Sequence, residues 1–172
     1  VAILWLLRQG ARVAYVDIDA HHGDGVQKAF YDSDRVLTIS IHESGRYLFP
    51  GSGEVGELGS GAGAGYSVNL PLAPSTGDDT YLWALRQVVP PLVSAFRPDV
   101  LATQLGIDTH ADDPLTHLAL TSRGFQEAVR ELKALSPGRW VAFGGGGYDM
   151  SAVARCWTLA FATMAGIELD DI

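Results

Sequence analysis

The sequence predicts an α/β protein built on a mostly parallel β-sheet with helices on both faces. Short, nearly continuous apolar runs rich in β-branched residues alternate along the 172 residues with longer segments of helical periodicity. This alternation is typical of parallel sheets that are buried on both faces. No internal repeat, long linker or block of charge divides the chain. We therefore expect residues 1–172 to form a single domain.

Five apolar runs have the length and composition of buried strands. The second, VLTISI, is typical: it is too short for a helix and rich in β-branched residues. The expected strands cover residues 12–18, 36–41, 66–70, 100–105 and 140–143.

Helical patterns lie between these strands, as parallel strands require. Gly10 should stop the first helix, and Ser75 or Thr76 should cap the third. We expect Pro90 and Pro91 to kink or break that third helix. The expected helices cover residues 1–9, 25–31, 78–96, 121–135 and 151–165.

Three further expectations concern residues around these elements. The glycine-rich stretch 51–65 should be a loop. Trp83 and Trp157 lie in helical patterns and should belong to the core, and Cys156 should be an inert buried thiol.

Composition limits the partners and the compartment. A net charge of −8 argues against nucleic acid as a direct partner and leaves basic ligands, such as lysine-bearing peptides or polyamines, open. A single cysteine excludes an intrachain disulfide framework and fits the reducing cytoplasm. No apolar run reaches membrane-spanning length and no secretory signal is recognisable. The chain begins with Val1 and already reads as the end of a helix, so we expect the amino-terminal part of a larger domain to lie outside it.

Three of the expected strands end in unusual polar residues. The first contains Asp17 near its end and is followed by Asp19 and His21, the fourth is followed by Asp108, and the fifth by four glycines and Tyr148. Ligands of open α/β sheets bind at the carboxyl ends of the strands. We therefore expect these three ends to converge on one cleft.

The acids and the histidine at these ends suit a metal ion. Asp19 and His21 are spaced by two and point to the same side of an extended segment, and Asp108 can supply a third ligand from another strand end. Two carboxylates and an imidazole suit Zn²⁺, with Fe²⁺ or Co²⁺ as alternatives, and leave a position for water. The competing interpretation is an acidic turn that caps the following short helix.

Aromatic residues near the cleft have two interpretations each. The glycines can place Tyr148 over the cleft, where its hydroxyl can donate to a developing oxyanion, but they can also form a plain turn beside a core tyrosine. Phe49 and its neighbours can form an aromatic wall or a packed loop anchor. His42, His110 and His117 are expected to be structural or loop histidines.

Taken together, these segments resemble the zinc-dependent histone deacetylase superfamily. The matching stretches include VAYVDIDAHHGDGVQKAFY, LGIDTHADDPLTHLALTSRGF, FGGGGYD and ARCW, in this order. RYLFPGSG and DPLTHL are most similar to the bacterial acetoin-utilisation (AcuC-like) branch. The resemblance implies the arginase/deacetylase-like three-layer α/β fold, here incomplete at the N-terminus, so that residues 1–172 are the C-terminal portion of a larger catalytic domain.

The resemblance also implies roles for individual residues. Asp19, His21 and Asp108 would hold the catalytic zinc, and Tyr148 would stabilise the oxyanion. Phe49 and Gly146 would contact the substrate. Asp17 and Asp24 would orient the two histidines of a catalytic dyad. Structural potassium is implied at two sites: Asp17, Asp19, His21, Ser40 and Ile41 at the first, and Phe30, Ser33, Val36 and Tyr66 at the second.

One departure from the family pattern concerns the general base. The Gly-His-His motif that carries the dyad is absent from these 172 residues, and His21-His22 cannot replace it because His21 is matched to the metal. We expect the dyad to lie in the missing amino-terminal part. For the intact enzyme the resemblance implies hydrolysis of an N-acetyl amide.

More than one substrate and more than one reaction class agree with the sequence. Acetyl-lysine on a bacterial protein is favoured, and an acetylpolyamine or another small acetylated amine also fits. An arginase-type ureohydrolase with two manganese ions is a further alternative, but Gly23 and His110 stand where its motifs need carboxylates. A non-catalytic acyl-lysine-binding module is the third. The oligomeric state is not predicted.

Overall fold

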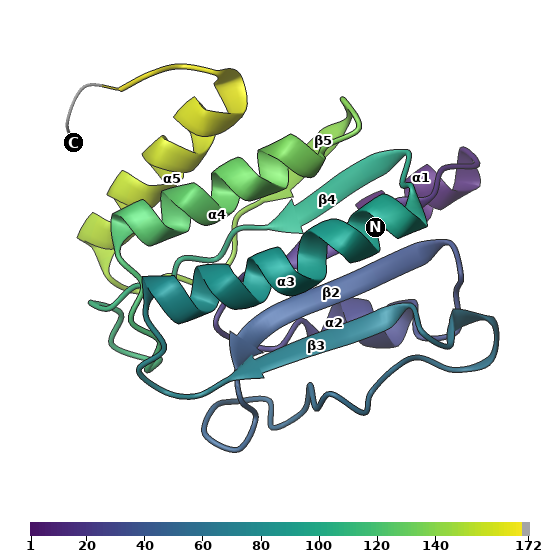
Figure 1. The fold of residues 1–172 in the computed structure, drawn as a ribbon, viewed down its shortest axis with the longest axis horizontal. Helices are drawn as coiled ribbons and strands as arrows, with labels where there is room; N and C mark the ends of the chain where they lie inside the picture. The colour runs from purple at the N-terminus through teal and green to yellow at the C-terminus, as the bar shows by residue number, and fades with distance from the viewer. Residues whose placement is uncertain (170–172) are drawn as a thin grey trace.

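The computed structural model describes residues 1–169 and contains a parallel sheet of five strands (Figure 1). The order across the sheet is β3-β2-β1-β4-β5, and every neighbouring pair is parallel. The strands are β1 (Val13–Asp17), β2 (Val36–Glu43), β3 (Ser67–Leu72), β4 (Val100–Gln104) and β5 (Trp140–Phe143). The predicted α/β fold with a parallel sheet is therefore confirmed.

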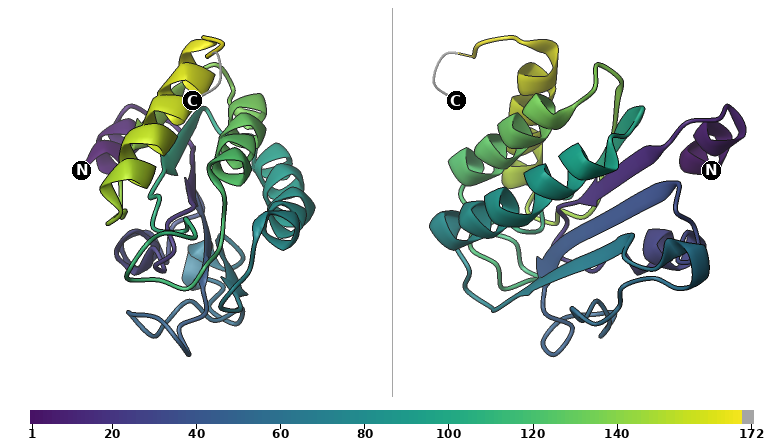
Figure 2. Two further views of the ribbon diagram at one scale, coloured as in Figure 1. Left: turned by 90° about the vertical axis from the view of Figure 1, so that its left-hand side faces the viewer. Right: turned by 45° about the vertical axis from the view of Figure 1, so that its right-hand side comes forward.

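Helices cover both faces of the sheet and make three layers. Figure 2 shows α3 and α4 on one face and α1 on the other, and α5 packs beside α4. The helices are α1 (Ala2–Arg8), α2 (Asp24–Ala29), α3 (Asp78–Phe96), α4 (Ser122–Leu135) and α5 (Met150–Ala165), with a short 3-10 turn at Gly61–Gly63. No helix in residues 1–169 is long and apolar enough to cross a bilayer.

The core lies on both sides of the central strands, which are buried along their whole length. The larger cluster fills the space between the sheet and α3, α4 and α5. A smaller one lies under α1 and α2 and contains Ile3, Val13, Tyr15, Phe30, Val36 and Ala102. The apolar runs therefore form strands because each residue of β1 and β2 loses contact with water on either face.

Helix ends follow local side-chain chemistry. The Thr121 hydroxyl accepts a hydrogen bond from Gly124 N (3.1 Å) at the start of α4, and Asp149 accepts one from Ala152 N (2.8 Å) at the start of α5. Gly166 ends α5 in the left-handed conformation. The Asp149 cap matters for the site because it fixes where the glycine-rich loop after β5 must end.

The expected break in α3 and its expected N-cap are both wrong. The helix runs unbroken through Pro90 and Pro91. The carbonyls that lose their bonds belong to Arg86 and Gln87, which lie on the exposed side where water can replace the missing donors. The N-cap is Gly77, without a side-chain hydrogen bond, in place of Ser75 or Thr76.

The prediction that two tryptophans lie in the core is also wrong. Trp83 is 64% exposed on the outer face of α3, and Trp157 is 37% exposed while its indole N–H donates to Leu105 O (2.9 Å). Cys156 is buried, as predicted.

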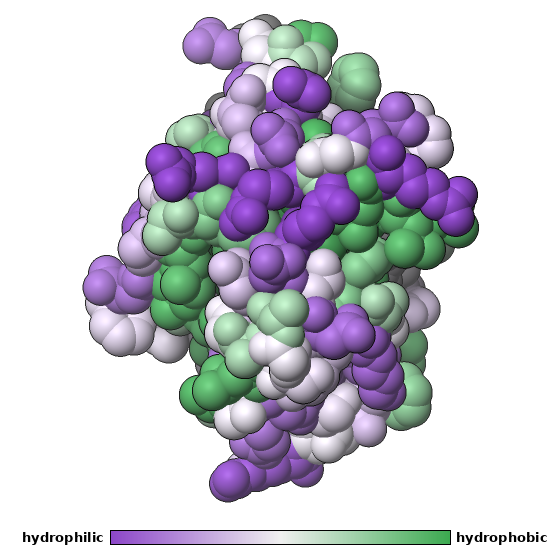
Figure 3. All heavy atoms as spheres, turned by 90° about the vertical axis from the view of Figure 1, so that its right-hand side faces the viewer, coloured by the Kyte–Doolittle hydropathy of each residue, from purple (hydrophilic) through white to green (hydrophobic). Residues whose placement is uncertain are grey.

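β5 is the more exposed of the two edge strands of the sheet. β5 pairs only with β4 among the described residues, and its Val141 and Phe143 side chains are both 37% exposed. Helix α1 also exposes Leu4 and Trp5. Figure 3 shows the end of the molecule nearest α1, where hydrophobic patches lie between hydrophilic residues.

Candidate metal centre

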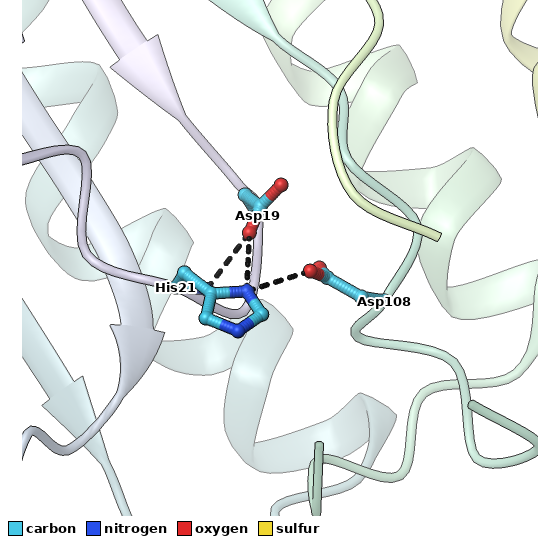
Figure 4. A group of neighbouring side chains, drawn as sticks. All are labelled: Asp19, His21 and Asp108. Atoms are coloured by element: carbon cyan, nitrogen blue, oxygen red, sulfur yellow. Dashed lines mark hydrogen bonds and ion pairs between the residues drawn. The ribbon is translucent and has the colours of Figure 1, made fainter. Parts of the chain in front are cut away.

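Asp19, His21 and Asp108 lie together at the carboxyl edge of the sheet (Figure 4). Asp19 and His21 follow β1, and Asp108 follows β4, which is hydrogen-bonded to β1 along its length. Their candidate ligand atoms all lie within 4.8 Å of one another. The predicted convergence of these strand ends is therefore present in the structure.

The geometry fits a small divalent ion. His21 Nδ1 is 2.8 Å from Asp108 Oδ2 and 3.1 Å from Asp19 Oδ1. Bonds of zinc length to one tetrahedral ion would place ligand atoms about 3.4 Å apart, so a small outward movement would admit the ion. Asp108 is fully buried and Asp19 is 5% exposed.

The electrostatics of the cluster suit a divalent cation. Hydrogen bonds to Asp108 and Asp19 raise the pKa of His21 to about 10. Burial raises the pKa of Asp108 to about 6, whereas the hydrogen bonds from His21 and Gln104 outweigh burial and lower the pKa of Asp19. The imidazolium is thus the counter-ion of two buried carboxylates. A divalent cation would take over that role and displace the His21 proton.

Surrounding groups orient both carboxylates. Asp19 Oδ2 accepts hydrogen bonds from Gln104 Nε2 and from Gly146 N, both at 2.7 Å. Asp108 Oδ1 accepts one from Ala20 N at 2.7 Å. A Cβ atom at Gly146 would collide with the Asp108 carboxylate, so only glycine fits there. Such support fixes ligand orientation in metal sites.

A pocket of about 340 Å³ opens beside the candidate ligands. Phe49 and Tyr148, expected to face the substrate, both line it and are largely exposed, at 79% and 50%. Its lining is Asp17, Asp19, His21, His22, Gly23, Phe49, Pro50, Gln104, Gly146 and Tyr148. A larger cavity of about 980 Å³ between α4 and α5 contains none of the predicted site residues.

The two acids assigned to a dyad lie in different surroundings. Asp17 is buried, which raises its pKa to about 7, and it accepts hydrogen bonds from the Tyr15 hydroxyl (2.6 Å) and Asp19 N (3.1 Å). Asp24 does not line the pocket. Its carboxylate pairs with Lys28 Nζ at 2.6 Å, which lowers its pKa. Their role toward a dyad stays a prediction.

The potassium assignments also stay predictions. In the first set, Ser40 lies opposite Asp17 on the neighbouring strand, and its hydroxyl accepts from Gly23 N (3.2 Å). In the second set, the Phe30 and Tyr66 carbonyls accept from Ser33 N (3.0 Å) and Thr38 N (2.9 Å).

The sequence did not predict that a neighbouring group of polar residues lies together. We call His22, Gln27, His42 and Ser52 the histidine cluster. His22 bonds Ser52 Oγ (2.9 Å) and Gln27 Oε1 (3.0 Å) through its two ring nitrogens. Gln27 is only 5 residues from His22, but Ser52 is 30 residues away, so no local pattern could have revealed the whole cluster. Gln104 was detectable as the polar residue at the end of an apolar strand.

Comparisons with known proteins agree with this geometry. The family model described as "Histone deacetylase domain" matches residues 1–164. The chain is 48% identical to the acetoin utilization protein AcuC of Bacillus subtilis, over 98% of this chain and 45% of the relative. It is 44% identical to a probable deacetylase of Archaeoglobus fulgidus, over 100% of this chain and 49% of the relative.

A solved structure shares the same architecture. An HDAC homologue from Aquifex aeolicus superposes with a TM-score of 0.93 at 39% identity, covering 98% of this chain and 46% of that one. The chain therefore spans less than half the length of these relatives. With a family match over nearly all residues, and with the candidate metal-binding triad in place, the chain belongs to the histone deacetylase domain family.

Proposed function

We propose that this chain carries the metal centre of a hydrolase that removes acetyl groups from N-acetyl amides, with acetyl-lysine on proteins as the favoured substrate. The carrying observation is that Asp19, His21 and Asp108 form one cluster beside a pocket that Tyr148 also lines. Zinc is the proposed ion and Fe²⁺ the alternative. When bound, it would act as a Lewis acid toward a carbonyl and a water.

The residues of the chain would divide the remaining work. Gln104 and Gly146 hold Asp19 in place through their hydrogen bonds. Phe49 would contact the acyl-lysine stem at the pocket mouth. Burial, followed by the charge of Asp108, raises the pKa of Tyr148, so its hydroxyl stays protonated at neutral pH and can donate to the oxyanion.

The general base needs a separate source. Both ring nitrogens of His22 already have partners, and His21 is a metal ligand. No other histidine among residues 1–169 lines the pocket. We therefore place the base outside residues 1–172, and we regard these residues as one part of a larger catalytic domain. The coverage of under half of each relative supports this placement.

Other assignments are part of the same proposal. The net charge of −8 favours a basic substrate such as a lysine-bearing protein over an acidic one. We also propose a cytoplasmic location and structural potassium ions. An arginase-type centre is disfavoured because neither position supplies a carboxylate ligand for a second ion. His110 bonds Ser122 (3.3 Å), and Gly23 has no side chain.

A non-catalytic acyl-lysine-binding module is the second candidate, because the described pocket contains no free base. Metal analysis and an acetyl-lysine peptide assay separate the two. Both should be run on this chain and on the protein at the length of its relatives. We expect one zinc per chain in both forms and chelator-sensitive deacetylation in the longer form only. Zinc and peptide binding without turnover in the longer form would favour the binding module, and two manganese ions would favour a ureohydrolase.

A further inference from the structure

Asp113 contacts the backbone of Tyr148 from a different loop. Its Oδ2 accepts a hydrogen bond from Tyr148 N at 2.8 Å, and its Oδ1 accepts one from Leu115 N at 2.9 Å. The residue is 8% exposed. We propose that Asp113 is a positioning residue that sets where the Tyr148 hydroxyl lies. This inference rests on the proposed function, in which Tyr148 donates to the oxyanion.

Tyr148 has little else to hold it. Four glycines precede it, and Gly147 has φ +142°, a region open chiefly to glycine. The Tyr148 side chain is half exposed and makes no hydrogen bond within residues 1–169. Upstream, the loop is fixed at Gly146, which donates to Asp19 and accepts from Ile107 N (2.7 Å). Downstream, Asp149 caps α5.

Asp113 fills the gap between these two anchors. Without its bond, two consecutive residues of the loop, Gly147 and Tyr148, would have no side-chain anchor of their own. Tyr148 could then rotate about a flexible glycine while its neighbours stay in place. The Asp113 carboxylate has no cationic partner within residues 1–169, so its hydrogen-bonding capacity is directed at backbone N–H groups. Hydrogen bonds from N–H groups to an ionised carboxylate are stronger than neutral ones.

The same loop also contacts a metal ligand. Thr116, three residues after Asp113, donates its hydroxyl to the Asp108 carbonyl. Asp113 N itself donates to His110 O at 2.9 Å. The segment after β4 therefore holds the backbones of both Asp108 and Tyr148, which places the proposed oxyanion donor at a fixed distance from the metal cluster.

The Asp113→Asn substitution tests this role with almost no change in volume. An amide keeps one oxygen, so one of the two N–H groups would face an NH₂ group instead of an acceptor. The adjacent Asp112→Asn is the matched control, because the Asp112 side chain is 67% exposed. Activity is measured in the protein at the length of its relatives, alone and in the Tyr148→Phe background.

We expect Asp113→Asn to lower kcat by roughly 10- to 100-fold with KM changed little, since a displaced catalytic group costs this much. In the Tyr148→Phe background the further loss should be under about 2-fold, because the hydroxyl is already absent. Zinc affinity should be unchanged, and Asp112→Asn should behave as wild type. Equal losses in both backgrounds, or a loss of zinc affinity, would overturn the inference.

A second measurement does not depend on turnover. In the 172-residue chain, Asp113→Asn should accelerate amide hydrogen exchange at Tyr148, measured by NMR, while Asp112→Asn should not. Unchanged exchange would refute the Asp113 anchor. If Tyr148→Phe leaves an active enzyme unimpaired, the oxyanion role in the proposed function fails, whereas the exchange result still decides whether Asp113 holds Tyr148.

Discussion

His21 and His22 are consecutive in sequence but belong to two different polar clusters. His21 faces the carboxylates of Asp19 and Asp108, whereas His22 faces a hydroxyl and an amide oxygen. In the first cluster, two buried carboxylates carry more negative charge than one imidazolium can balance. In the histidine cluster, His22 bonds neutral groups, and the Glu57 carboxylate accepts from Gln27 Nε2 (2.6 Å) instead of from a histidine. The charge of the partners, and not the histidine itself, therefore distinguishes the candidate metal centre from the histidine cluster.

Substitutions in the two clusters should differ most in their effect on zinc affinity. His21→Ala should weaken zinc binding by at least about 100-fold, since a direct ligand matters more than the outer contacts whose loss costs about 10- to 100-fold. His22→Ala should change it by only a few fold. Zinc dissociation constants from competition with a chromophoric chelator check both. Similar losses in the two variants would erase the distinction.

The two clusters should also differ in how their stability depends on pH. His42 is fully buried, and burial, followed by the nearby His22, lowers its pKa to about 4. It faces His22, Glu57, the Ser40 hydroxyl and the Gly53 carbonyl. Its pKa is thus lower in the folded state than in the unfolded chain, so the unfolded state takes up more protons as the pH falls below about 6.5.

The stability that neutral His42 provides should therefore be complete at pH 7.5 and decline as the pH falls toward 4. The loss by pH 4.5 should be about 2.5 kcal/mol, by linkage between the two pKa values. Urea unfolding at several pH values measures it, with His42→Gln as the reference that lacks the titrating group. Parallel pH profiles for wild type and His42→Gln would contradict the assignment.

His22→Ala should lower the free energy of unfolding by about 2 kcal/mol, because Gln27 and Ser52 would lose buried hydrogen-bond partners. The urea midpoint at pH 7.5 measures this change. Circular dichroism should show the same helix content as wild type. An unchanged midpoint would mean that the histidine cluster does not stabilise the fold.

The smallest effect is expected at the surface. Lys28 pairs with Asp24 one helical turn away, and its side chain is 70% exposed. Lys28→Ala should change the free energy of unfolding by less than about 0.5 kcal/mol, because solvent screens such pairs. Zinc affinity should stay the same. A measurable fall in zinc affinity would connect Asp24 to the metal cluster after all.

Much of the fold could be predicted from sequence because the strands are continuous apolar runs. Each expected helix and strand is present, with bounds close to those predicted. The proximity of Asp19, His21 and Asp108 could likewise be predicted, because it follows from the carboxyl ends of parallel strands meeting at one edge of the sheet. The rest depends on contacts between distant segments. Pro90 and Pro91 stay helical because the carbonyls that lose their hydrogen bonds lie on the solvent-exposed side of α3. Asp113 contacts Tyr148, which is 35 residues away in the sequence.

Among residues 1–169 β5 pairs with β4 alone, which has a practical consequence for handling the protein. A strand with a free edge and apolar side chains such as Val141 and Phe143 can recruit a strand from another molecule. The net charge of −8 opposes close approach of two copies, but salt screens it. Aggregation should therefore increase with ionic strength, and light scattering during a salt titration would report whether another polypeptide shields that edge.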